Sequence, residues 1–420
     1  MADLWSWSDV MTGLTSWNPP PPSAMESPAD RFQYLACLVY GEWHRRNPQL
    51  AEQLLAEHPE LAAADLYCAA AAGNAAHVAA LLDGDPALID ATGGALRWPP
   101  LLYACYSRLE DRAGRSTLDV ARVLLERGAD PDAGILWDGT YAFTAITGAF
   151  GRGEDWINQL PHPHAEALAR LLLEAGADPN DGQTLYNRHF QPDDTHLRLL
   201  LAYGLGKDRG GPWIARVGGK GYSPERMLIE EVWGAAKYGF ADRIRLLAAH
   251  GADLNTPGIR NQRTPYEEAL RAGHPDVAEL LVSLGARRVE LDELEAFALD
   301  CITGRADTVR ARLAADPTLV ERLGHHGRVE MLHRAVEARR YDGVRLIASL
   351  GIDLNAMIPG CGLDRAVLHQ AALIGDLAMV TLLVELGADT TLRDCTHNAP
   401  PLGWATYANQ AHVVEYLRQR

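Results

Sequence analysis

One short pattern recurs six times in this chain of 420 residues: a few apolar residues followed by Gly, most often as Gly-Ala-Asp. The step from Gly251 to Gly285 is 34 residues, that from Gly351 to Gly387 is 36, and the 66 residues between Gly285 and Gly351 fit two periods. A period near 33 residues is the length of a β-turn plus two helices, so the pattern predicts an array of helix pairs. The six passages are LLERGADPDA from Leu124, LLEAGADPND from Leu172, LAAHGADLNT from Leu247, LVSLGARRVE from Leu281, IASLGIDLNA from Ile347 and LVELGADTTL from Leu383.

The residue types inside one period agree with this prediction. In residues 263–286, Thr264 supplies a hydroxyl to cap a helix and Pro265 suits the first helical position. Apolar residues then recur at spacings of three and four, as on a helix with one buried face. Gly285 is expected to end that helix in a left-handed conformation. Because one helix pair cannot cover its own apolar face, neighbouring pairs must stack and share a continuous core.

Three passages, residues 263–286, 330–353 and 366–389, resemble the T-P-L-H-x-A-A…G-H…V…LL…GAD pattern of the ankyrin repeat family. The resemblance extends over residues 65–420 in about ten units. It implies an all-α solenoid of helix-turn-helix repeats joined by short hairpin loops. It also implies a structural role for His333 and His369, which occupy the histidine position of the T-P-L-H motif. The GHHG stretch ahead of His333 is interpreted as a hairpin tip.

The sequence predicts three regions. Residues 1–26 contain SWNPPPPS and are expected to form a flexible tail rich in Pro and Trp. Residues 27–64 are predicted to form an N-terminal helical cap that covers the exposed end of the repeats, and residues 65–420 the solenoid. Insertions near 108–117, 151–164 and 206–224 lengthen individual repeats. They either flank and partly roof one stretch of the groove or are harmless additions to loops.

Composition excludes several classes of partner. The formal net charge of −16 opposes binding to nucleic acid or to anionic membranes, which both require basic patches. No run of 18 apolar residues is present, and the N-terminus has no secretory pattern, so a cytoplasmic protein is expected. The six cysteines are far apart without a C-x-x-C motif, which favours small buried residues over a metal site or a disulfide framework. We expect a monomer.

The ankyrin resemblance implies which positions face the concave groove. Several of them are aromatic or basic, which favours a groove that binds a peptide or protein segment or an apolar ligand. Alternatively, the aromatic rings are covered by the insertions and form a local core. The predicted ligand-binding residues are Trp98, Tyr106, Tyr141, Phe150, Lys237, Tyr238, Arg263, Arg271, His397 and Tyr407.

Established catalytic and nucleotide-binding motifs are absent from the sequence, so no cofactor is expected. His162 and His164 form an HPH motif, but no further ligand of recognised spacing accompanies them, and we predict a polar turn and no metal site. The alternative function is a cofactor-free enzyme of the dehydratase/lyase, isomerase or cyclase type. It would use acid–base chemistry on an apolar small molecule in the groove of repeats two to five. Its candidate catalytic residues are Asp138, Glu154, Asp155, His189 and Tyr141.

Overall fold

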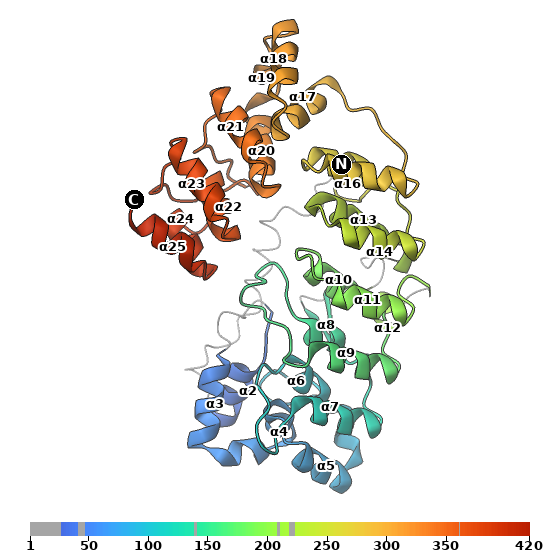
Figure 1. Ribbon diagram of the computed structural model, residues 1–420. Helices are drawn as coiled ribbons and strands as arrows, with labels where there is room; N and C mark the ends of the chain where they lie inside the picture. Colours follow the sequence, from blue (N-terminus) through green and yellow to red (C-terminus); the bar gives the residue numbers. More distant parts are fainter. Residues whose placement is uncertain (1–26, 41–46, 138–140, 208–210, 218–222, 361) are drawn as a thin grey trace. The chain divides into compact units, whose positions relative to one another are not determined.

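The computed structural model describes residues 27–40, 47–137, 141–207, 211–217, 223–360 and 362–420 (Figure 1). Residue contacts divide the described chain at Glu231 and Val232 into two compact units, here called the N-terminal unit and the C-terminal unit. Each unit is described by itself. The predicted tail, residues 1–26, lies outside the described residues.

The N-terminal unit consists mainly of short helices. Its elements are α2 (Pro28–Ala36), α3 (Pro48–Glu57), a 3₁₀ helix (Pro59–Ala63), α4 (Leu66–Ala72), α5 (Ala75–Gly84), a second 3₁₀ helix (Pro86–Asp90), α6 (Pro100–Tyr106), α7 (Thr117–Glu126), β1 (Gly134–Trp137), β2 (Tyr141–Thr144), α8 (Ala145–Phe150), α9 (Ala165–Glu174), α10 (Gly182–Arg188), α11 (Thr195–Ala202) and α12 (Pro212–Val217).

The C-terminal unit consists of helices joined by loops, and the unit boundary falls within α13. Its elements are α13 (Pro224–Tyr238), α14 (Ala241–Ala249), α15 (Pro265–Arg271), α16 (Pro275–Ser283), α17 (Glu293–Ile302), α18 (Ala306–Ala315), α19 (Leu319–Arg322), α20 (Gly324–Glu337), α21 (Tyr341–Ser349), α22 (Val367–Ile374), α23 (Leu377–Glu385), α24 (Pro401–Tyr407) and α25 (Ala411–Arg418).

Consecutive helix pairs stack within each unit. In the N-terminal unit the first helices α4, α6, α8 and α10 contact one another in chain order, as do the second helices α5, α7, α9 and α11 (Figure 1). In the C-terminal unit α15, α17, α20, α22 and α24 make the same succession of contacts. Within the C-terminal unit a continuous core runs between neighbouring helix pairs and includes the fully buried side chains of Phe297, Val344 and Leu383. The structure is therefore mostly helical, and apolar faces are buried between neighbouring pairs, as the periodicity predicts.

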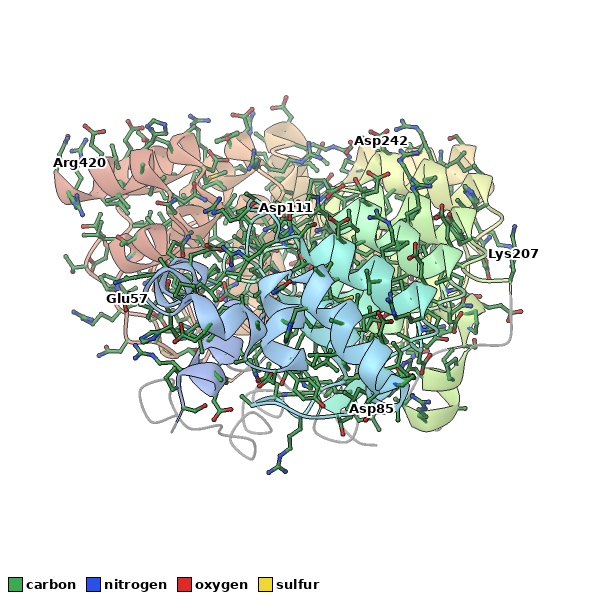
Figure 2. The ribbon with its side chains drawn as sticks, turned by 90° about the horizontal axis from the view of Figure 1, so that it is seen from below. Glu57, Asp85, Asp111, Lys207, Asp242 and Arg420 are labelled. Carbon is green, nitrogen blue, oxygen red and sulfur yellow. The ribbon has the colours of Figure 1, made fainter. Side chains whose placement is uncertain are left out.

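Helix ends follow the sequence signals closely. Ser27 and Asn47 accept hydrogen bonds from backbone N–H groups in the first turns of α2 and α3. Thr264 caps α15 in a reciprocal arrangement with Glu267, in which each side chain accepts from the backbone of the other. Gly285 follows α16 with a φ of 109°, the left-handed region that its position requires. Charged side chains at other helix ends, such as Glu57 and Asp85, are exposed (Figure 2).

In the N-terminal unit β1 and β2 pair antiparallel in a hairpin between helix pairs, with Gly134 opposite Thr144 and Trp137 opposite Tyr141. One expectation about backbone structure is wrong. The GHHG stretch is not a hairpin tip but the first turn of α20, which runs on to Glu337. None of the helices among the described residues is long and apolar enough to cross a membrane.

Candidate binding site

Three of the predicted groove residues are buried inside the N-terminal unit. Trp98, Tyr106 and Phe150 are each no more than 3% exposed. The ring of Tyr106 lies 5.1 Å from that of Trp98 and 6.4 Å from that of Tyr40, and its hydroxyl donates to the carbonyl of Thr144. Phe150 packs separately against His196, with ring centroids 6.0 Å apart. Trp98 and Tyr106 belong to an internal aromatic cluster, so none of the three residues faces an open groove as predicted. The cover of Tyr106 includes Tyr40, which comes from the chain after α2.

The first two insertions contact each other. Arg108 is 6% exposed. It donates to the carbonyl of Gly148, just before the insertion of residues 151–164, and to the carbonyl of Leu160, inside the insertion. His164 Nε2 lies 3.0 Å from a carboxylate oxygen of Asp111, in the first insertion. The hydroxyl of Tyr40 donates to the carbonyl of Arg152 at 2.8 Å. The insertion is thus attached to the body of the unit at both ends.

The HPH motif forms a polar turn. His162 is buried, and its Nδ1 accepts the backbone N–H of His164 at 3.0 Å. The neutral ring must then carry its proton on Nε2, which donates to the hydroxyl of Thr117 at 2.8 Å. Burial, followed by the charges of Arg108 and His164, holds the pKa of His162 well below its usual value. Both ring nitrogens are occupied, and no group of three metal-ligating side chains occurs among the described residues.

The third insertion packs against the hairpin. Its helix α12 contacts β2, and Trp213 donates from Nε1 to the carbonyl of Asp132 at 2.8 Å. The same indole lies directly over Gly134, where a β-carbon would come within 2.5 Å of the ring. Tyr141 is half-buried beside Trp137, with ring centroids 5.7 Å apart. Asp138, a candidate catalytic residue, lies outside the described residues.

The other candidate catalytic residues each lie beside a polar or charged group. Glu154 accepts a hydrogen bond from the hydroxyl of Tyr186 on α10, whereas Asp155 accepts from Asn158 within the insertion. His189, at the end of α10, lies 3.5 Å from a carboxylate oxygen of Glu231.

A carboxylate beside a phenol and an imidazole beside a carboxylate are chemically suited to proton transfer. One cavity of the described residues lies between α2 and α3 and another in the C-terminal unit, and the catalytic candidates line neither of these two.

The predicted residues of the C-terminal unit are more accessible. The ammonium group of Lys237 lies 5.2 Å from the ring of Tyr238, and both side chains are half-buried at the end of α13. His397 is exposed with its ring 5.5 Å from that of Trp404. Tyr407, at the end of α24, is 48% exposed. These residues are at least partly accessible, and none of them lines either of the two cavities named above.

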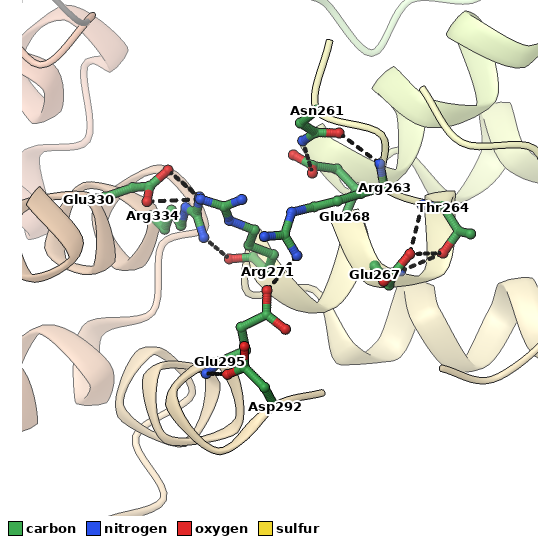
Figure 3. Close-up of polar contacts among 10 residues, drawn as sticks. All are labelled: Asn261, Arg263, Thr264, Glu267, Glu268, Arg271, Asp292, Glu295, Glu330 and Arg334. Atoms are coloured by element: carbon green, nitrogen blue, oxygen red, sulfur yellow. Dashed lines mark hydrogen bonds and ion pairs between the residues drawn. The ribbon is translucent and has the colours of Figure 1, made fainter. Parts of the chain in front are cut away.

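Arg263 and Arg271 line a cavity of about 170 Å³ between α15, α17 and α20 (Figure 3). Its wall is largely apolar, and its charged groups lie on the three helices and on the loop before α15. Arg263 pairs with Glu295 of α17, and Arg271 pairs with Glu330 of α20 at 3.0 Å. The apolar lining consists of Leu291, Leu294, Ala298, Leu299, Ile302, Leu323 and Met331.

Glu330 connects two arginines at the edge of this cavity. It accepts hydrogen bonds from Arg271 and from Arg334, one turn further along α20, and Arg334 also donates to the backbone carbonyl of Arg271 (Figure 3). Burial raises the pKa of Glu330, but the charges of Arg334 and Arg271 outweigh burial, so its pKa is below the usual value. The carboxylate is therefore ionised at neutral pH.

The sequence prediction includes Arg263 and Arg271 but misses Glu330, Met331 and Arg334. The available signal was the spacing of Glu330 and Arg334, four residues apart, which places them on one helix face. That signal predicts a local ion pair. It does not reveal that the pair also meets Arg271, 59 residues earlier in the chain.

Comparison with known families supports the repeat interpretation in one part of the chain. A family model for ankyrin repeats (many copies) matches residues 332–384. This stretch runs from the second half of α20 through α23 and includes Arg334 at the cavity. A comparison with curated proteins found no match.

Residues 332–384 thus contain ankyrin repeats, a class of helical repeat that generally mediates contacts between proteins. The match suggests a protein-binding role.

Proposed function

We propose that this protein binds a segment of a partner protein on the face of the C-terminal unit formed by α15, α17 and α20. One large apolar side chain of the partner would enter the cavity beside Arg271. The observation that carries this proposal is an apolar cavity with a charged edge between α15, α17 and α20. The last of these helices enters the stretch that matches ankyrin repeats. In such interfaces, buried anchor residues supply most of the binding energy.

The size of the cavity favours a side chain over a free small molecule. Its volume of about 170 Å³ is close to the roughly 150 Å³ of an apolar cavity that accommodates benzene. Pockets for metabolites and drugs are commonly about 300–1,000 Å³. A cavity of the smaller size fits an aromatic ring or a branched aliphatic group, while the rest of the partner would lie along the helices outside it.

We further propose that the helix pairs outside residues 332–384 are ankyrin-type units that form one solenoid over residues 65–420, with residues 27–64 as its cap. The supporting observation is that first helices contact first helices in both units, as expected for stacked repeats. Circular dichroism spectra of fragments that end between helix pairs would test this. Repeat arrays can lose terminal pairs while the remainder stays folded, so these fragments should remain helical.

The binding proposal is tested by filling the cavity. Ala298 lines it from α17, so Ala298→Trp should occupy the space intended for the partner. The control is Ala311→Trp on α18, where the side chain is exposed. Peptides would be selected from a random displayed library on the intact protein, and their affinities measured by fluorescence anisotropy.

Burial of a large apolar side chain contributes about 1.5–3 kcal/mol to binding. Ala298→Trp should therefore lower the affinity for the selected peptides by roughly tenfold or more. Ala311→Trp should leave their affinity unchanged, and circular dichroism would verify that both variants fold. Failure to select any peptide, or equal affinity for both variants, would overturn the proposal.

A second candidate function is cofactor-free acid–base catalysis in the N-terminal unit. It is favoured by the hydrogen bond between Glu154 and Tyr186, which brings a carboxylate from an insertion to a phenol on α10. The test is to screen apolar metabolites for turnover by the wild-type protein and by Glu154→Gln. Loss of a detected activity in the variant would support this function, and activity that persists in Glu154→Gln would exclude Glu154 from it.

A further inference from the structure

The two arginines of the cavity have hydrogen-bonding capacity to spare. Arg271 uses only Nη2 for Glu330, and Arg263 uses only Nη1 for Glu295. The remaining side-chain N–H groups of both residues make no hydrogen bond to any part of the chain that the structure describes. Each of these side chains is about 25% exposed. Donors of this kind beside an apolar cavity are suited to an acceptor that arrives with the partner.

Three arginines and three carboxylates line the cavity, so their charges balance in number, but one carboxylate serves two of the arginines. Glu330 is shared between Arg271 and Arg334, and Arg334 is the more buried of the two arginines, with a side chain 18% exposed. Burial lowers the pKa of Arg334; the attraction of Glu330 opposes this shift, and the repulsion from Arg271 adds to it. A second anion near the two guanidinium groups would relieve that repulsion.

The charge of the favoured anion is limited by the acidic residues nearby. Glu295, Glu330 and Asp292 all line the same cavity. A phosphate group carries close to two negative charges at neutral pH and would meet all three carboxylates. A carboxylate carries one charge and matches the planar fork of an arginine with two hydrogen bonds. The site therefore favours a carboxylate over a phosphate.

We propose that the partner segment carries an Asp or Glu directly beside its large apolar residue, with the carboxylate bound by the free N–H groups of Arg271 and Arg263. This inference rests on the proposed function, because it specifies the chemistry of the segment that occupies the same cavity. The apolar residue supplies contact area, and the acidic residue fixes which way the segment runs across α15, α17 and α20. A partner with a neutral or basic residue at that position is rejected.

The experiment uses the peptides selected on the intact protein. Selected sequences should be enriched in Asp or Glu beside a large apolar residue. Replacing that acid by its amide should weaken binding to the wild type by about tenfold or more, since hydrogen bonds between charged groups are among the strongest. The same replacement should have little effect on binding to Arg271→Gln. The control is Arg288→Gln, at an arginine that is 58% exposed and pairs with Glu279 away from the cavity.

Each outcome separates this inference from the proposed function. In one outcome Ala298→Trp blocks the peptides while the peptides show no preference for an acidic residue or no response to Arg271→Gln. That result would overturn the proposed carboxylate contact and leave the cavity as the binding site. Tighter binding of a phosphoserine peptide than of the matching Asp peptide also overturns it. If no peptide is selected at all, the proposed function fails, and the carboxylate fails with it. Circular dichroism of Arg271→Gln checks that weakened binding does not arise from unfolding.

Discussion

His162 donates from Nε2 to the hydroxyl of Thr117 at 2.8 Å, a bond that joins the end of the second insertion to the first turn of α7. The ring can donate here because its Nδ1 is occupied by the backbone N–H of His164. The HPH motif is therefore a polar turn in which His162 is part of the core and the half-buried His164 lies beside Asp111.

Removing the acceptor should destabilise the N-terminal unit. Thr117→Val keeps the shape of the side chain but leaves the buried N–H of His162 without the hydroxyl, at an expected cost of about 1–3 kcal/mol. Urea unfolding followed by circular dichroism measures this change. Thr117→Ser retains the hydroxyl and is the control; an equal loss in the two variants would show that packing, and not the hydrogen bond, is responsible.

Arg108 is expected to be more important than any other arginine of the insertions. Its guanidinium group donates to the carbonyls of Cys105, Ser107, Gly148 and Leu160. Lysine cannot reproduce this planar set of donors, so Arg108→Lys should lower the free energy of unfolding by about 2–4 kcal/mol.

The same change should expose residues 151–164 to proteolysis. Limited digestion followed by mass spectrometry would locate the new cleavage sites. Arg112→Lys is the control, because Arg112 is exposed and lies 3.7 Å from its acidic partner Glu52. A cleavage pattern shared by both variants would contradict the assigned role of Arg108.

Acidification should destabilise the C-terminal unit through His333. Burial, together with the charge of Arg365, lowers the pKa of His333 to about 4. The unfolded chain takes up a proton near pH 6.5 while the folded chain does not, so stability is full above pH 6.5 and falls as the pH is lowered toward 4. At pH 5 the expected loss from this residue is about 2 kcal/mol.

Urea unfolding of the wild type and of His333→Gln at pH 7 and pH 5 measures this contribution. The glutamine variant should lose less stability on acidification than the wild type does. An identical pH dependence in the two proteins would assign the effect to other groups.

Two glycines at helix ends should respond in opposite directions to alanine. Gly285 has a φ of 109° with open space around its β-carbon position, so Gly285→Ala should cost about 1–2 kcal/mol through backbone strain alone. Gly84 ends α5, also has open space, and has no positive φ, so Gly84→Ala should be neutral or stabilising by up to about 1 kcal/mol. Thermal unfolding measures both. A destabilisation of the same size at both positions would contradict the conformational explanation.

Local features of the fold could be predicted from the sequence because they depend on neighbouring residues. Ser27, Asn47 and Thr264 cap helices as their positions indicate. His369 donates to the carbonyl of Leu392, in agreement with the structural role that the resemblance implies. The GHHG stretch was misassigned because its glycines suggest a turn, whereas α19 ends immediately before it and leads directly into α20.

The direction of side chains at the candidate sites could not be predicted in the same way. Tyr106 was predicted to face the groove, but it is 1% exposed and packs against Tyr40 and Trp98. The cavity beside Arg271 depends on Glu330 and Arg334, which are brought there by the packing of α20 against α17. Such contacts join residues far apart in the chain, and the repeat period alone carries no information about them.

The hydroxyl of Tyr40 also has a consequence for how the N-terminal unit assembles. It bonds to Arg152 and to Asn187, which are 112 and 147 residues away along the chain. A repeat array in which each unit contacts only its neighbours can fold or unfold one unit at a time. Here the hydroxyl of Tyr40 cannot complete its hydrogen bonds until residues near Arg152 and Asn187 are in place, and the closure of such long loops slows the search for these contacts. The N-terminal unit is therefore expected to acquire its final order in one concerted step.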